Sequence, residues 1–345
     1  DYMLGELTCL VPPWSRIEPR QEPGTIGGIS RRRLGPLEGT RLQSILGNPR
    51  TRLGMLAVWV AVVILYGLIS FLIAQGVTKA DRDPQEEHPA DYNLVFEDVD
   101  FASRRGDVSL SGWYLPGEDS GPHLIFVHGI GSVRSGDNAV ELAARMVDLG
   151  YSVLLFDLRG HGSSGGSKVS GGYFERWDVL GAFDYLVDRG GDPSRMGLMG
   201  FSMGAATSIM AAAEEPLITA VAADSPYADA SDLIARESAR KTPFPEWMIP
   251  IFIPTTKLMA RAFYGINIGS LVPEKSVAEL GYPVFVIHGI ADDRIPWEHG
   301  RRVAAAAETG SSLWLVPGVD HVDAFLTHPG EYVERVNKYF GSRLR

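Results

Sequence analysis

The most extended hydrophobic pattern is an uncharged run near the N-terminus. Residues 53–74 form a stretch of 22 residues without a charged side chain. As a helix this stretch would extend about 33 Å, at about 1.5 Å per residue, which is enough to cross the hydrocarbon core of a bilayer. The alternative is a buried core helix, but such helices rarely run this far without a polar face. The pattern therefore predicts a transmembrane helix over residues 53–77.

From residue 92 onward, short apolar or β-branched runs alternate with helical stretches. This alternation is typical of βαβ units and predicts an α/β domain, a mostly parallel sheet with helices on both faces. Residues 94–103 and 108–115 are expected to open the domain as an antiparallel hairpin. The parallel strands are expected at residues 124–127, 153–156, 196–199, 218–222, 284–287 and 313–316. The helices between them are expected at residues 138–149, 174–188, 203–213, 299–308 and 331–340.

One interval, residues 225–282, is too long for a single crossover. It contains an apolar stretch and predicts a short helical cap inserted into the sheet domain. The region before the apolar run, residues 1–50, is rich in Pro, Gly and Arg and shows no apolar period, which predicts disorder. The expected organisation is a disordered segment at 1–50, a transmembrane helix at 53–77, a charged linker at 78–91 and an α/β domain at 92–345.

Charge is distributed unevenly along the chain. Residues 1–80 carry 9 Lys and Arg against 5 Asp and Glu, whereas residues 81–345 carry 23 against 37. A nucleic-acid partner is not expected for the acidic part, because phosphates require positive charge. The only cysteine, Cys9, allows no internal disulfide and no thiolate metal site downstream.

The arginines before the apolar run bear on its orientation. Six of them lie within about 20 residues before it, at positions 31, 32, 33, 41, 50 and 52, whereas only Lys79 and Arg82 follow closely. The positive-inside rule then places the N-terminus in the cytoplasm and the α/β domain on the exported side of a single-pass membrane protein. A cleaved signal peptide is the alternative, but about 50 preceding residues exceed a usual n-region.

The sharpest chemical motif is G-x-S-x-G at residues 200–204, between a predicted strand and an Ala-rich helix. A tight strand-to-helix turn strains the serine backbone, tolerates only small neighbours and presents the Oγ above the sheet at the positive end of the helix. This context predicts that Ser202 is a nucleophile. Without it, the same string would be a glycine-rich loop.

A serine nucleophile needs a histidine base and usually a carboxylate that fixes the imidazole tautomer. Of the eight histidines, His321 is favoured because it lies between the last predicted strand and the last helix. Asp292, just after the strand at 284–287, is the favoured acid. Asp224 also satisfies the order Ser, Asp, His and stays open as the alternative acid. Asp293 could replace its neighbour if the loop register differed by one, although a turn or capping role is expected for it.

Two backbone donors are expected to stabilise an oxyanion. One is the amide of Met203, directly after the nucleophile, and the other belongs to the His-Gly-x-Gly loop at 128–131, with Ile130 favoured. A phosphate cradle is the alternative for this loop, but it has neither the G-x-G-x-x-G spacing nor a P-loop lysine.

Together with D-x-R-G-x-G at residues 157–162 and His-Gly-x-x-Asp at 288–292, these motifs resemble the α/β-hydrolase family over about residues 92–342. The D-x-R-G-x-G string and the short cap are similar to its monoglyceride-lipase-like and serine-aminopeptidase-like bacterial branch. The resemblance implies a carboxylic ester hydrolase that uses Ser202, Asp292 and His321, with no metal and no cofactor.

The expected activity is that of an esterase or of a monoacylglycerol or lysophospholipid lipase, working through an acyl-enzyme. A peptidase or thioesterase with the same three residues stays open, as does a non-catalytic binding module. The apolar cap stretch at 249–264 favours a lipid-like ester near the membrane, but packing of the cap on the core explains the same pattern. A small soluble ester is therefore equally compatible, and the oligomeric state is not indicated.

Overall fold

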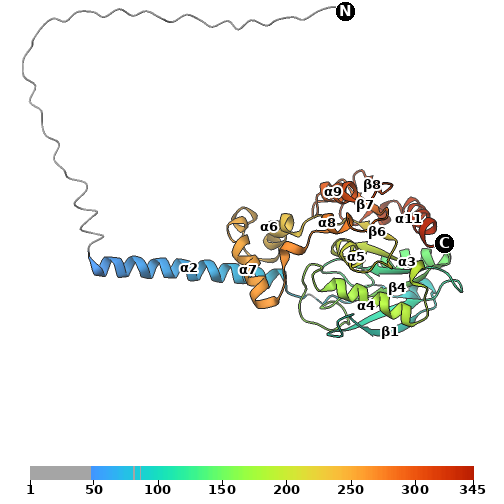
Figure 1. Cartoon of the computed structure of the whole chain (residues 1–345), viewed down its shortest axis with the longest axis horizontal. Coiled ribbons are helices and arrows are strands. Elements are labelled where there is room, and N and C mark those ends of the chain that lie inside the picture. Colours follow the sequence, from blue (N-terminus) through green and yellow to red (C-terminus); the bar gives the residue numbers. More distant parts are fainter. Residues whose placement is uncertain (1–47, 81, 86) are drawn as a thin grey trace, which may run out of the picture. The chain divides into compact units, whose positions relative to one another are not determined.

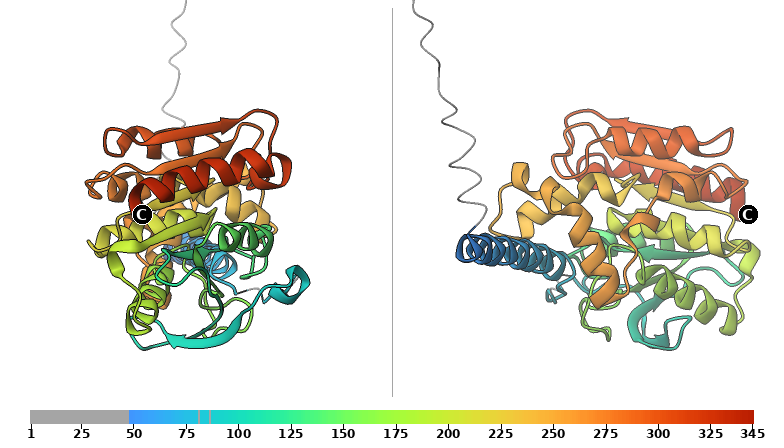
Figure 2. Two further views of the ribbon diagram at one scale, coloured as in Figure 1. Left: turned by 90° about the vertical axis from the view of Figure 1, so that its right-hand side faces the viewer. Right: turned by 60° about the vertical axis from the view of Figure 1, so that its left-hand side comes forward.

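A computed structural model describes residues 48–80, 82–85 and 87–345. The segment predicted to be disordered, residues 1–50, lies almost entirely outside these residues. By its contacts the chain divides into two units, Asp1–Trp59 and Val60–Arg345. The second unit holds the sheet, and Figures 1 and 2 show its helices on both sides of the strands.

The sheet has eight strands in the order β1-β2-β4-β3-β5-β6-β7-β8. Strand β2 pairs antiparallel with β1 and with β4, and the neighbours from β4 through β3 to β8 are parallel. The strands are β1 (Glu97–Ala102), β2 (Ser109–Leu115), β3 (His123–Val127), β4 (Ser152–Phe156), β5 (Met196–Phe201), β6 (Val221–Asp224), β7 (Phe285–Gly289) and β8 (Ser312–Val316). The predicted α/β architecture, with a mostly parallel sheet opened by a hairpin, is confirmed.

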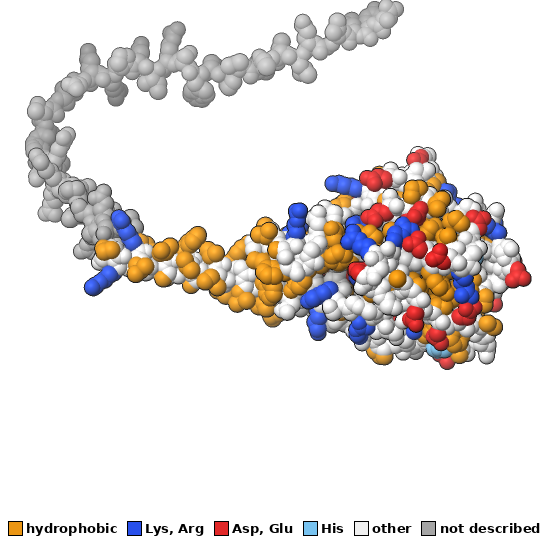
Figure 3. Space-filling model, turned by 60° about the horizontal axis from the view of Figure 1, so that its bottom comes forward, with side chains coloured by type: hydrophobic (Ala, Val, Ile, Leu, Met, Phe, Trp, Pro, Cys, Tyr) orange, Lys and Arg blue, Asp and Glu red, His pale blue; other side chains and the backbone are white. Residues whose placement is uncertain are grey.

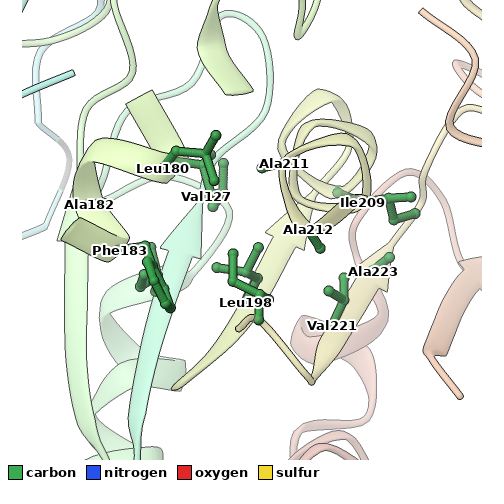
Figure 4. Close-up of a cluster of buried hydrophobic side chains, with 14 of the residues drawn as sticks. Val127, Leu180, Ala182, Phe183, Leu198, Ile209, Ala211, Ala212, Val221 and Ala223 are labelled. Atoms are coloured by element: carbon green, nitrogen blue, oxygen red, sulfur yellow. The ribbon is translucent and has the colours of Figure 1, made fainter. Parts of the chain in front are cut away.

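Alternate residues of the central strands point to opposite faces of the sheet. On β3, Ile125 and Val127 join one buried cluster, whereas Leu124 and Phe126 join the other. Figure 4 shows the first cluster, between the sheet and two helices. This face is covered by α4 (Glu175–Asp188), α5 (Met203–Glu214), α8 (Pro273–Val277) and α9 (Glu298–Ala306). The other is covered by α3 (Ala139–Asp148), α10 (Ala324–Thr327) and α11 (Pro329–Leu344).

Strand β6 begins later than the apolar pattern predicts. The expected strand covered residues 218–222, but pairing with β5 extends over Val221–Asp224. Ile218 and Ala220 are fully buried although they precede the strand. The residues just before the strand are apolar because they are buried, not because they pair in the sheet. The hydrophobic pattern therefore predicts the start of β6 about three residues too early.

The cap consists of α6 (Ala230–Lys241), η3 (Glu246–Ile251), α7 (Ile253–Tyr264) and η4 (Ile268–Ser270). The region predicted as cap, 225–282, also contains α8. That helix packs against α5 and α9, and its Val277 is fully buried among core side chains. Helix α8 is therefore part of the core of the α/β domain, and the cap proper ends near Leu271.

The apolar run near the N-terminus forms α2 (Pro49–Val77), the one helix among the described residues that is long and apolar enough to cross a membrane. Its first part is exposed, but one face of its last turns packs on the cap. Tyr66 stacks on Phe252 with ring centroids 5.1 Å apart and donates a hydrogen bond to the carbonyl oxygen of Ile251 at 2.7 Å. Ile73 is fully buried in the same apolar cluster.

The segment after α2 is hydrogen-bonded to the sheet domain. The Arg82 guanidinium donates to the carbonyl oxygens of Gly162, Ser164 and Gly166, each at 2.7 Å. The carbonyl oxygen of Thr78 accepts from the Val169 amide at 3.1 Å. Thr78 and Arg82 of the expected linker, residues 78–91, are thus bound to the domain, and the short helix η1 (Pro89–Tyr92) follows.

Candidate active site

Ser202 occupies the sharp turn between β5 and α5. Its backbone has φ 54° and ψ −119°, a conformation that non-glycine residues rarely adopt. A Cβ at Gly204 would lie 2.0 Å from the Val127 carbonyl oxygen, and one at Gly200 would lie 2.5 Å from the carbonyl oxygen of Gly204. The two glycines of the motif are therefore required by the close approach of backbone to backbone at this turn.

The structure brings three of the predicted side chains into one hydrogen-bonded row. Nε2 of His321 lies 2.8 Å from Oγ of Ser202, and Nδ1 of His321 lies 2.7 Å from Oδ2 of Asp292. The three residues come from the ends of β5, β7 and β8, whose C-terminal ends meet at one edge of the sheet. With Nδ1 protonated and donating to the carboxylate, Nε2 is left as an acceptor toward the hydroxyl.

Asp292 is held by donors on both oxygens. Its Oδ1 accepts from the backbone amides of Arg294 at 2.9 Å and Ile295 at 2.7 Å. Its Oδ2 lies 3.2 Å from Nε2 of His288 in addition to its bond with His321. Burial alone would raise the pKa of Asp292, but the hydrogen bonds from the two rings and from the Ile295 amide outweigh burial and lower it. The carboxyl group is therefore ionised at neutral pH.

The alternative acid lies elsewhere. Asp224 is buried, and its oxygens accept from the Tyr332 hydroxyl at 2.8 Å and the Ser225 hydroxyl at 3.0 Å. Burial raises the pKa of Asp224 to about 6. Asp293 is exposed and pairs with Arg240 at 3.3 Å. Neither carboxylate takes the place of Asp292 on the imidazole.

Ile130 and Met203, the residues predicted to supply the two amide donors, line the same cavity as Ser202. In the part of the chain that the structure describes, neither amide donates to a protein acceptor. The Ile130 loop is braced by His161, whose Nε2 accepts from the Gly131 amide at 3.3 Å. Nδ1 of His128 also lies 2.7 Å from the carbonyl oxygen of Gly129 in this loop. Burial lowers the pKa of His128 to about 3, so its ring is neutral.

Two cavities meet at Ser202. One, of about 130 Å³, is lined mainly by apolar side chains, among them Leu233 of α6, Ile268 of the cap and Val77 at the end of α2. The other, of about 250 Å³, is lined by His321, Arg294, Ser132, Asp137 and Asp83 together with backbone of the Ile130 loop. An ester bond at the Ser202 hydroxyl would thus have an apolar space on one side and a polar space on the other.

Several contributors could not be assigned from the sequence. His288 contacts Asp292 and His161 contacts the Ile130 loop, although only their places in His-Gly-x-x-Asp and D-x-R-G-x-G hint at this. Arg294 borders both cavities and donates to Glu237 at 3.3 Å. Within the described ranges, no cluster of three or more His, Cys, Asp or Glu side chains could hold a metal ion.

Comparison with known proteins agrees with this arrangement. A family profile described as "alpha/beta hydrolase fold" matches residues 122–252. The uncharacterized protein YqkD of Bacillus subtilis is 24% identical over 81% of this chain and 93% of its own length. Lysophosphatidylserine lipase ABHD12 of Danio rerio is 27% identical over 61% of this chain and 54% of its own. The Pyrococcus furiosus esterase Pf2001 superposes with a TM-score of 0.63 at 26% identity, over 77% of this chain and 100% of that one.

Proposed function

We propose that this chain is an α/β-hydrolase that cleaves carboxylic esters with a serine nucleophile. Its esterase and lipase relatives support ester hydrolysis in general. The observation that carries the proposal is the row of hydrogen bonds from Ser202 Oγ through the His321 ring to Asp292, at 2.8 and 2.7 Å. An imidazole held in this way can take the hydroxyl proton during attack on a carbonyl carbon.

The proposed mechanism has two half-reactions. Ser202 Oγ attacks the acyl carbon while His321 takes its proton, and the amides of Ile130 and Met203 stabilise the tetrahedral oxyanion. His321 then returns the proton to the departing alcohol oxygen as the ester bond breaks, which leaves an acyl-enzyme. Water attacks the acyl-enzyme with His321 again as base, and the acid is released as the Ser202 hydroxyl is restored. Asp292 stabilises the imidazolium in both halves.

The two cavities favour an amphiphilic substrate with one acyl chain. The apolar cavity suits the acyl chain, and the polar cavity suits the head group that leaves as the alcohol. We infer a monoacylglycerol or a lysophospholipid rather than a small soluble ester. Arg294, at the border of the two cavities, is placed to meet an anionic head group.

We also propose that α2 anchors the enzyme in a membrane. The length and composition of the helix support this, and an excess of arginine before the helix favours a cytoplasmic N-terminus with the hydrolase domain on the exported side.

The test is labelling of the full-length protein with a fluorophosphonate probe, together with hydrolysis of p-nitrophenyl butyrate. Ser202→Ala should abolish both, whereas Ser208→Ala, a matched change at a buried serine of α5 that lines neither cavity, should keep both. Labelling that persists in Ser202→Ala would contradict the proposal. A series of monoacylglycerols and matched thioester and amide substrates then defines the bond and the chain length.

A further inference from the structure

We propose that the cap of this enzyme lies within the surface of the bilayer and receives the acyl chain of its substrate directly from the leaflet. The proposal rests on the proposed function and on α2 as its membrane anchor. It concerns η3 and α7 of the cap and the last turns of α2, all of which belong to one contact unit with the hydrolase domain.

The cap contacts α2 at a level that lies inside the bilayer. Arg50 and Arg52 precede the uncharged part of α2, so the hydrocarbon core cannot begin before about Leu53. A core of about 30 Å takes up about 20 helical residues and therefore reaches at least Leu72. The cap, however, already contacts α2 at Tyr66. About seven residues, or about 10 Å of helix, are thus within the depth of the leaflet and beside the cap at once.

Tilting of the helix does not remove this overlap. A tilted helix needs more residues to cross the same thickness, so the hydrocarbon core would extend further along α2 and the overlap would grow. The contacts are also specific. The Thr256 hydroxyl of α7 donates to the Ser70 carbonyl oxygen at 3.4 Å. The ring of Phe71 packs edge-on against that of Phe263, with ring centroids 5.3 Å apart. The cap is therefore held at this level of the helix.

The cap exposes several large apolar side chains. Trp247 of η3 is 76% exposed and Leu258 of α7 is 61% exposed, and Ile251 and Phe263 are exposed to a similar extent. These large apolar side chains stand on η3 and α7, the two cap elements that touch α2. Immersion of a few ångströms in the headgroup and acyl boundary would bury them, as for interfacial amphipathic helices.

The cap carries a net positive charge. Residues 230–271 carry five Lys and Arg against three Asp and Glu, whereas residues 81–345 as a whole carry 23 against 37. The cap is thus a basic island on an acidic domain, which suits anionic lipid head groups. Figure 3 shows Lys and Arg side chains around the end of the apolar helix.

The cap and the end of α2 also line the apolar cavity at Ser202. The wall of the apolar cavity includes Val77 and Thr78 of the α2 end, Thr256 of α7 and Leu233 of α6. The elements placed at the leaflet are therefore the elements that enclose the acyl chain. A chain that leaves the bilayer along α2 and α7 would reach Ser202 without passing through water.

The depth experiment uses the full-length chain with Cys9→Ser and one new cysteine, Leu258→Cys, labelled with the fluorophore NBD. The protein is reconstituted in vesicles of equal parts phosphatidylcholine and phosphatidylglycerol, with and without brominated acyl chains. The bromines should quench the label at position 258. The matched control is Leu217→Cys, a 52% exposed leucine between α5 and β6, at the sheet edge away from Ser202, and its label should stay unquenched.

The activity experiment compares Leu258→Glu with Leu217→Glu. Leu258→Glu should lower the rate on vesicle-embedded monoacylglycerol by about tenfold, the factor that corresponds to about 1.4 kcal/mol of lost docking. Its rate on soluble p-nitrophenyl acetate should stay unchanged, and Leu217→Glu should change neither rate.

An unquenched label at position 258 overturns the proposal. If that label is also shielded from water, the cap is covered by protein instead. Equal losses on both esters in Leu258→Glu, with thermal unfolding unchanged, overturn it as well, because position 258 would then affect the chemistry and not docking on the bilayer. Failure of the proposed function is distinct: the unsubstituted protein would then hydrolyse neither ester, while the quenching result would still report where the cap lies.

Discussion

Replacing Asp292 by asparagine preserves the shape of the side chain but changes what it can accept. Oδ1 accepts from the backbone amides of Arg294 and Ile295 at 2.9 and 2.7 Å, so the asparagine oxygen must occupy that position to keep both bonds. The amide nitrogen then takes the place of Oδ2 and faces Nδ1 of His321. Because the NH₂ group can only donate, Nδ1 becomes an acceptor and the ring proton moves to Nε2, where it points at Ser202.

This inverted tautomer cannot act as the base. The loss expected for a serine hydrolase with the wrong tautomer is ~10⁴ in kcat. At about 1.36 kcal/mol for each factor of ten, this corresponds to about 5.4 kcal/mol of transition-state stabilisation. KM for a short ester should change little, because Asp292 lines neither of the two cavities that meet at the nucleophile.

The assay measures kcat and KM for p-nitrophenyl butyrate in detergent, with thermal unfolding as the check on folding. Asp224→Asn is the matched control: this carboxylate is also buried, but its oxygens accept hydrogen bonds from Tyr332 and Ser225. It should leave kcat nearly unchanged. Wild-type kcat in Asp292→Asn, or an equal loss in Asp224→Asn, would refute the assignment of the acid.

The remaining predictions concern the nucleophile turn, the buried carboxyl group and the acyl cavity. Gly204→Ala places a Cβ 2.0 Å from the Val127 carbonyl oxygen and should cost about 3 kcal/mol or more of unfolding free energy in urea titration; an unchanged midpoint would mean that this backbone can move apart. Burial raises the pKa of Asp224 to about 6 from 3.8, so its stabilising protonation is fully present below pH 3.8 and lost as the pH rises through 6. Between pH 7 and pH 5 the unfolding free energy should therefore gain about 1 kcal/mol that Asp224→Asn lacks, and an identical pH profile would contradict this. Leu233→Trp should fill the apolar cavity and lower kcat/KM for long acyl chains more than for butyrate; an unshifted chain-length profile would place the acyl chain elsewhere.

Much of the site could be predicted because parallel strands deliver their C-terminal ends to one edge. A motif between a strand and a helix singled out Ser202, and the loops after the later strands singled out His321 and two carboxylates. These grounds favoured Asp292 but left Asp224 open, because Asp224 ends β6 and Asp292 follows the neighbouring strand β7. The side-chain direction separates them: one turns to Tyr332 and the other to the imidazole.

Other features depend on loop conformation, which hydrophobic periodicity does not encode. The polar composition of residues 78–91 indicates exposure, but nothing in it shows that the Arg82 guanidinium meets three carbonyl oxygens of the D-x-R-G-x-G loop region. The apolar stretch of the cap likewise left open whether it packs on the core or faces a lipid. The contact between Tyr66 and Phe252 adds a third role, since part of the cap packs on α2.

Val77 at the end of α2 and the adjacent Thr78 line the apolar cavity at Ser202, and Arg82 secures the segment that follows. Under the proposed function, α2 and the α/β domain are therefore not interchangeable modules. A soluble fragment that begins at residue 92 would keep Ser202 and its partners but would have a cavity open on one side. Such a fragment would understate the preference for long chains, and a foreign membrane helix spliced in place of α2 would change what the enzyme selects as well as where it resides.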